Sequence, residues 1–298
     1  MKTERNGTVE SPEATAQSGE KTLVAHLGAH KTATSLVQKY FKDKKDYYDD
    51  QGVLALTRSE VSPFISWGDQ IMEDPWKFNK FLHGKAKRAT GKYVLMSNEN
   101  TLGRPFKERP GLYPDHARII PAFAKVLQGF QPRIVYSIRP QWEFLESYYL
   151  QRVQQGYFLT FSQYVQEIDL AQISWLPLIS QLREVFGADN VLVFDFGLIR
   201  KGQEVFLSEF VKRAISSDVT PDLDYGQVHN ASLSDRGLQM ALRINPLLKP
   251  DETGIIRRFL QENFSNLTEP RPTLMSEAMR AELKERYADE YKSLIGEG

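Results

Sequence analysis

The chain has 298 residues, with 38 Lys and Arg against 38 Asp and Glu, and it contains no cysteine. The lack of cysteine excludes a disulfide framework, a thiolate metal site and a cysteine nucleophile. The balanced charge argues against a broad surface for nucleic acid, and no apolar run approaches the ~20 residues that a membrane-spanning helix needs.

The first 20 residues differ in composition from the rest. Residues 1–20 are polar and charged, with one Val and one Met as their only larger apolar side chains. Such a segment buries too little surface to offset its ordering entropy, so we predict a disordered tail. It also lacks the apolar region of a secretory signal, which predicts a cytoplasmic protein. No later stretch is typical of a linker, so we expect one domain over residues 21–298.

Strand and helix patterns alternate from residue 21 to residue 215. Near-continuous apolar runs predict buried strands at 22–27 (TLVAHL), 53–56 (a weaker run), 93–97 (YVLMS), 133–138 (RIVYSI) and 191–194 (VLVF). Helical patterns lie between the runs, at 36–41, 119–127, 175–186 and 203–213, and the chain from Ser232 onward is typical of helices only. We therefore predict an α/β fold of three layers, α/β/α, with a central parallel sheet and a helical C-terminal extension.

Ligands of such folds bind beyond the carboxyl ends of the strands. The loop after the first strand has the sequence Gly28-Ala29-His30-Lys31-Thr32-Ala33-Thr34-Ser35. A strand, a loop of small residues and a helix N-terminus together favour an anion site, to which Lys31 adds a positive charge. The alternative is an ordinary turn in which Ser or Thr caps the helix. The loop does not match G-x-x-x-x-G-K-[ST], because no glycine stands directly before Lys31, which lies three residues after Gly28, and this disfavours Mg·ATP.

A second candidate loop follows the strand at 133–138. Arg139 comes at the end of this strand, Pro140 fits the first turn of a helix, and Ser147 lies about two helical turns beyond Arg139. Arginine supplies planar donors that match a phosphate, and serine adds one more. The alternative is that Arg139 pairs with a nearby carboxylate such as Glu143.

Together the two loops resemble a known enzyme family. GAHKTATSLVQ at 28–38 is similar to the 5′-phosphosulfate loop of sulfotransferases that use 3′-phosphoadenosine 5′-phosphosulfate (PAPS). RIVYSIRPQWEFLESYY at 133–149 is similar to their 3′-phosphate motif, and the order of the two segments also fits. The resemblance is most specific in these segments and extends loosely over residues 21–215.

The resemblance implies a nucleotide-binding, P-loop-like fold with PAPS as co-substrate and adenosine 3′,5′-bisphosphate as product. It implies that Lys31 contacts the sulfate-bridging oxygen, that Thr34 and Ser35 contact the 5′ end, and that Arg139 and Ser147 hold the 3′-phosphate. We expect His30, Thr32 and Ala33 to complete the loop around the nucleotide. Ala33 stands where the family commonly has glycine, and His30 where it often has proline. Because alanine does not readily follow glycine to positive φ, we expect the loop geometry to shift slightly.

Sulfonate transfer needs a base that takes the proton of the acceptor. Glu99 is our candidate, because it follows the strand at 93–97, and family members that modify carbohydrates often carry a glutamate in a similar place. The alternatives are that Glu99 caps a helix starting near Asn100, or that His229 is the base. No three His or acidic residues have ligand spacing, so we predict no metal.

The acceptor is the least defined part of the prediction. We expect a hydroxyl or an amine, with a carbohydrate as the expected class, and the segment 64–76 with two Trp residues is our candidate for an acceptor lid. The aromatic residues of 142–164 are expected to pack in a core. A nucleotide-dependent kinase and a non-catalytic relative that binds a nucleotide or a glycan are the alternative functions, and the oligomeric state is open.

Overall fold

The structure is a computed structural model, and it describes residues 21–107, 110–226 and 231–296. The predicted tail at 1–20 lies outside the described residues, as does His229. Among the helices of the described ranges, none is both long enough and apolar enough to cross a bilayer.

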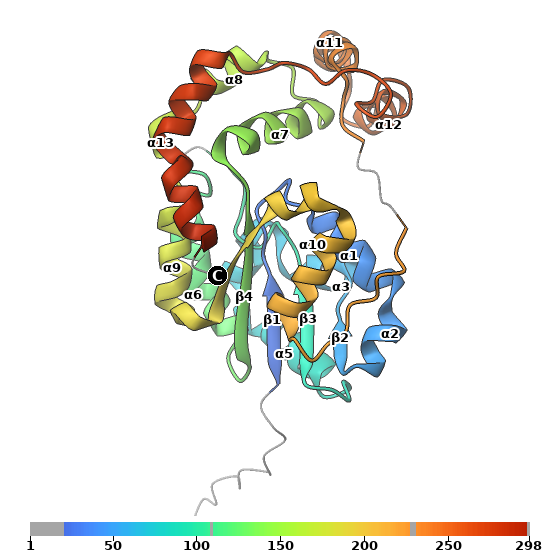
Figure 1. Cartoon of the computed structure of the whole chain (residues 1–298), viewed down its shortest axis with the longest axis vertical. Coiled ribbons are helices and arrows are strands. Elements are labelled where there is room, and N and C mark those ends of the chain that lie inside the picture. The colour runs from blue at the N-terminus through green and yellow to red at the C-terminus, as the bar shows by residue number, and fades with distance from the viewer. Residues whose placement is uncertain (1–20, 108–109, 227–230, 297–298) are drawn as a thin grey trace, which may run out of the picture.

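A five-stranded sheet forms the centre of the fold (Figure 1). The strands are β1 (Thr22–His26), β2 (Val53–Ala55), β3 (Tyr93–Ser97), β4 (Gln131–Ile138) and β5 (Val191–Asp195). They pair in the order β2-β3-β1-β4-β5, and every pairing is parallel. All five predicted strands are confirmed, and β4 begins two residues earlier than predicted. The apolar runs are near-continuous because helices cover both faces of the sheet.

Two layers of helices enclose the sheet, which confirms the three-layer α/β/α prediction. One face is covered by α1 (Thr34–Asp43), α2 (Lys45–Asp50) and α10 (Gln203–Phe210), and the other by α5 (Pro75–Ala86), α6 (His116–Val126) and α9 (Leu176–Phe186). Successive residues of a strand point to opposite faces. In β1, Val24 therefore packs in the core under α1, whereas Leu23 and Ala25 pack in the core under α6.

The remaining helices lie mostly beyond the carboxyl ends of the strands (Figure 1). They are α7 (Gln141–Gln154), α8 (Phe161–Gln166), α11 (Asp235–Ile244) and α12 (Thr253–Asn263), and a long α13 (Glu277–Gly296) packs against α7 and β5. Two short helices, α3 (Arg58–Val61) and α4 (Asp69–Glu73), follow β2. The predicted helical C-terminal extension is confirmed, with one addition, an antiparallel bridge between Leu233 and Ser265.

The aromatic residues of 142–164 mostly fill the core, as predicted. Phe144 and Tyr149 are fully buried, and Phe144 stacks on Tyr148 with ring centres 5.7 Å apart. Phe158 is the exception, with half of its side chain exposed. These rings anchor α7 to the sheet, and α7 in turn carries the second predicted anion motif.

Candidate functional site

The loop after β1 is built around two left-handed residues. Lys31 and Ala33 both have a φ of 63°, and Ala33 is the residue directly before α1. The expectation that alanine would not take a positive φ here is wrong: Ala33 adopts the left-handed conformation that glycine would take without strain. That conformation costs an alanine about 1–2 kcal/mol, so the surrounding contacts hold the loop in place.

The N-terminus of α1 is left open. No side chain caps this helix, so the alternative of a capped ordinary turn is wrong. The Thr32 hydroxyl donates to the Ala29 carbonyl oxygen at 2.5 Å and stabilises the loop itself. The buried Thr34 hydroxyl, in contrast, has no hydrogen-bond partner among the described residues, and Ser35 is exposed. Because first-turn amides also lack intrahelical acceptors, several donors are free to meet an anion at this point.

A buried histidine forms the floor of the loop. His26 in β1 lies between the hydroxyls of Ser97 and Ser137, at 2.9 Å and 3.0 Å, and so connects the carboxyl ends of three neighbouring strands. Burial lowers the pKa of His26 to about 3, so the ring is neutral. Gly28 passes close above it, because a Cβ there would lie 2.9 Å from Nε2 of His26. The loop backbone can approach the sheet only because this residue is glycine.

His30 lies within the loop, but its side chain is engaged elsewhere. Nδ1 lies 2.8 Å from the Tyr113 hydroxyl, and Nε2 lies 3.1 Å from Oδ1 of Asn100. The Trp67 ring stacks on the imidazole with ring centres 5.4 Å apart. Burial lowers the pKa of His30 to about 4, and Lys31 and Arg58 act in the same direction. The ring therefore supports the loop as a neutral group, and a nucleotide contact by it remains a prediction.

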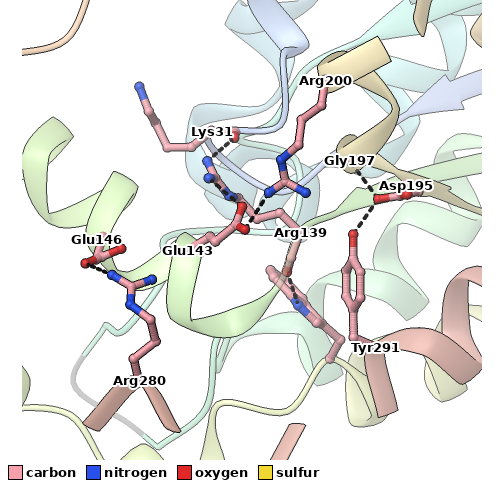
Figure 2. Close-up of polar contacts among 10 residues, drawn as sticks. Lys31, Arg139, Glu143, Glu146, Asp195, Gly197, Arg200, Arg280 and Tyr291 are labelled. Carbon is pink, nitrogen blue, oxygen red and sulfur yellow. Dashed lines mark hydrogen bonds and ion pairs between the residues drawn. The ribbon is translucent and has the colours of Figure 1, made fainter. Parts of the chain in front are cut away.

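Lys31 provides the free cation of the loop. Burial, together with the guanidinium groups of Arg139 and of Arg257 in α12, lowers its pKa to about 8. Within the described ranges its ammonium has no acceptor or carboxylate partner. In Figure 2 its side chain points away from the Arg139–Glu143 pair. A desolvated, unpaired ammonium of this kind is stabilised by any anion that enters.

Arg139 is held against the same loop. Its Nη1 donates to the Lys31 carbonyl oxygen at 3.0 Å, and its Nη2 contacts a carboxylate oxygen of Glu143 at 3.2 Å (Figure 2). The contact between Arg139 and Glu143 that the alternative predicted is therefore confirmed. Nε of Arg139 is nevertheless buried and has no hydrogen-bond partner among the described residues, so the hydrogen-bonding capacity of the guanidinium is not fully used.

Two neighbours complete this cluster. Arg200 also forms an ion pair with Glu143, and the Trp175 indole nitrogen donates to the Arg139 carbonyl oxygen at 2.9 Å. Ser147 is half-buried on α7, one helical turn beyond Glu143. The helix thus presents Glu143 and Ser147 on one face. The structure brings Lys31 and Arg139 together, while the roles of Ser147 and Arg139 in holding a phosphate stay predictions.

Glu99 lies at the end of β3 and is held by two partners. One carboxylate oxygen accepts from Nε2 of Gln38 at 3.2 Å, and the other pairs with Arg58 at 3.2 Å. The alternative of a helix cap is wrong, because residues 99–102 form a turn and no helix begins near Asn100. The charge of Glu99 acts on the pKa values of both Lys31 and His30, which places it beside the loop.

The sequence reasoning missed two charged groups, Arg200 and Arg257, and recognised only part of the role of a third, Glu143. Arg200 follows β5 and reaches the same edge of the sheet, a position that the strand pattern could have indicated. Glu143 was weighed only as a partner of Arg139 and not as a bridge between two arginines. Arg257 lies on a helix far along the chain, and no local pattern marks it.

Asp195 bears on the kinase alternative. It is the acidic residue that directly follows the apolar run 191–194, the position from which a carboxylate could hold Mg²⁺. Its carboxylate accepts the Gly197 amide at 2.6 Å and the Tyr291 hydroxyl, so both contacts tie it into the scaffold (Figure 2). No observation in this region favours a phosphoryl-transfer site.

Comparisons with known proteins show a likeness to solved structures only. No protein-family model matches the chain, and no curated protein matches it. Among solved structures, a sulfotransferase from Alicyclobacillus acidocaldarius is similar at 13% identity with a TM-score of 0.44, covering 89% of this chain and 100% of that chain. A likeness at this identity and score does not carry an activity from one chain to the other, so any function must be argued from the residues of this chain.

Proposed function

We propose that this chain transfers a sulfonate group from PAPS to an acceptor hydroxyl at the carboxyl edge of its sheet. The observation that carries the proposal is the open N-terminus of α1, where the Thr34 hydroxyl has no partner and the Lys31 ammonium is unpaired. These groups fit the 5′ end of an anionic nucleotide, because free amides, an unpaired hydroxyl and a cation belong to the same loop and helix N-terminus.

The residues take roles that follow from their charge. Lys31 and the helix N-terminus stabilise the negative charge that develops on the leaving phosphate. Arg139, with a buried partnerless Nε, and Ser147 on the same helix face contact the 3′-phosphate. Glu99, beside the loop, accepts the proton of the acceptor. Contact between Arg139 and Lys31 supports the proposal, because one ligand can then reach both motifs.

A thermal-shift comparison tests the donor. Ligands that bind only the folded state raise its melting temperature by mass action. We expect adenosine 3′,5′-bisphosphate to raise the melting temperature without Mg²⁺, and Mg·ATP to raise it less. Preference for Mg·ATP would overturn the proposal in favour of a kinase.

A transfer assay tests the reaction. With PAPS labelled in the sulfonate, the wild-type protein is expected to label an acceptor from a panel of sugars, phenols and amines, and Lys31→Ala is expected to lose this activity. If the nucleotide raises the melting temperature but no sulfonate is transferred to any acceptor, the protein binds the nucleotide and is not an enzyme.

A further inference from the structure

A cleft next to the loop has no role in the proposal so far. Its volume is about 370 Å³, and it lies between the 3₁₀ turns that follow α3 and the end of β3. Its walls include Ser62, Ser66, Trp67, Gln70, Asn98 and Asn100. The segment 64–76, predicted as a lid, thus supplies much of one wall.

Two side chains that line the cleft contact His30 of the anion loop. Asn98 and Asn100 flank Glu99, and Oδ1 of Asn100 lies 3.1 Å from Nε2 of His30. Trp67, in the opposite wall, stacks on the same imidazole with an angle of 3° between the rings. An acceptor in the cleft would therefore lie beside Glu99 and next to the loop that carries Lys31.

The walls match a neutral, hydroxyl-rich compound. The lining residues carry amides, hydroxyls and one indole, and none of them is Lys, Arg, Asp or Glu. The Ser66 hydroxyl and Nδ2 of Asn100 have no hydrogen-bond partner within the described part of the chain. A phenol would leave such groups unpaired on binding, and an unpaired buried polar group is costly. An acidic sugar would find Glu99 nearby, Arg58 already pairs with Glu99, and the Arg104 guanidinium lies over the Trp67 ring, 4.9 Å from its centre.

The wall segment is also held in an unusual conformation. Ser66, Trp67 and Gly68 are three consecutive residues with φ of 39°, 59° and 87°. A positive φ is a rare conformation for a bulky residue such as Trp, and strained segments of this kind gather at binding sites. Only glycine fits at position 68, because a Cβ there would lie 2.5 Å from the Ile119 side chain of α6. The close packing against α6 holds the segment in this conformation. The Trp67 ring is thus presented by a rigid support.

We propose that this cleft binds the acceptor, and that the acceptor is an uncharged sugar unit; the inference rests on the proposed function. In the transfer, the sugar hydroxyl oxygen forms a bond to the sulfonate sulfur, and the bond from sulfur to the bridging phosphate oxygen breaks. The electron pair of that bond leaves with adenosine 3′,5′-bisphosphate, and the hydroxyl proton passes to Glu99.

Ligand-detected NMR tests the cleft without requiring turnover. The probes are methyl β-glucopyranoside, the corresponding methyl glucuronide and 4-nitrophenol, each added to the protein saturated with adenosine 3′,5′-bisphosphate. We expect the neutral glycoside to bind best, and Gln70→Ala to weaken it about tenfold, which is the loss of one hydrogen bond. Gln128→Ala is the matched control, because Gln128 is exposed and precedes β4 at the opposite edge of the sheet.

The outcomes separate the two proposals. Preference for the glucuronide or the phenol, or neutral binding that Gln70→Ala leaves unchanged, would overturn the cleft assignment while the donor site stands. Absence of a thermal shift with adenosine 3′,5′-bisphosphate would overturn the proposed function itself, whatever the glycoside does.

Discussion

The guanidinium of Arg139 donates to the backbone carbonyl of Lys31 at 3.0 Å, across 108 residues of sequence. The contact exists because β1 and β4 are neighbours in the sheet, so the loops that follow them meet at the same edge. It joins the two segments that carry the resemblance into one electropositive site. After burial, the charge of Arg139 is the largest influence that lowers the pKa of Lys31.

The affinity for adenosine 3′,5′-bisphosphate should fall as the pH rises above 8. Burial and Arg139 lower the pKa of Lys31 to about 8, and a bound phosphate raises it again, so binding above pH 8 takes up a proton. The dissociation constant then rises by up to about tenfold per pH unit. Titration calorimetry at pH 7 to 9.5 measures this slope, and Lys31→Arg should flatten it because arginine stays charged. Equal slopes in the two proteins would contradict the role of Lys31.

Glu99→Gln should abolish most of the transfer rate and leave nucleotide binding unchanged. A general base contributes about 10²- to 10⁴-fold, and glutamine cannot accept the proton. The measurement is the initial rate with labelled PAPS, together with the thermal shift. Glu60→Gln is a control of the same chemistry, since Glu60 pairs with Lys85 and not with the site. Full activity in Glu99→Gln would move the search for the base to His229.

Glu143→Gln should lower the stability of the free protein and tighten nucleotide binding. The Glu143 carboxylate pairs with both Arg139 and Arg200, so its loss leaves two guanidiniums near one another without a counter-charge. We expect the unfolding free energy to fall by about 1–2 kcal/mol and the affinity to rise about tenfold, because the phosphate then supplies the missing charge.

Denaturant unfolding and calorimetry measure the two effects of Glu143→Gln. Glu146→Gln is the matched control, because Glu146 lies on the same helix and pairs with Arg280 instead. Weaker nucleotide binding in Glu143→Gln would mean that the carboxylate orients Arg139 and does not compete with the ligand.

Ala33→Gly should stabilise the protein. Ala33 has a φ of 63°, a conformation that glycine adopts without the penalty of a Cβ, so the unfolding free energy should rise by about 1 kcal/mol. Ala124→Gly in α6 is the control, where the same substitution should destabilise by a similar amount. Guanidinium unfolding measures both, and a loss of stability in Ala33→Gly would show that its methyl group contributes more than the strain costs.

Stability should fall as the pH drops below 6.5. Burial lowers the pKa of His26 to about 3 and that of His30 to about 4, so the unfolded chain binds more protons in this range. Each histidine can remove up to about 1.4 kcal/mol of unfolding free energy per pH unit. His26→Asn should lower stability at pH 7, because the contacts to Ser97 and Ser137 change, yet reduce the slope between pH 6.5 and 4.5. If the unfolding free energy of His26→Asn changed with pH as steeply as that of the wild type, the result would contradict a buried, neutral His26 ring.

Local pattern was enough to predict the strands and the position of the two loops at their carboxyl ends. A strand covered on both faces must be apolar throughout, and a loop that leads into a helix N-terminus presents amides whatever the rest of the chain does. The open cap of α1 and the position of Arg139 at the end of β4 therefore follow from residues close together in sequence. The alternative of a helix starting near Asn100 is wrong for a local reason, because the Asn98 side chain accepts the Asn100 amide and a turn forms.

The partners of these residues depend on the tertiary structure. Glu143 of α7 meets Arg200 from the 3₁₀ helix after β5, and Arg257 of α12 acts on Lys31. Trp67 stacks on His30 from a stretch that shows no regular pattern. Such pairs form only after the parallel strands align and bring distant loops to one edge. In a parallel sheet, the loops that become neighbours are those of adjacent strands, and strand order differs from chain order. Only the tertiary structure therefore decided which charged side chains attract one another and which repel.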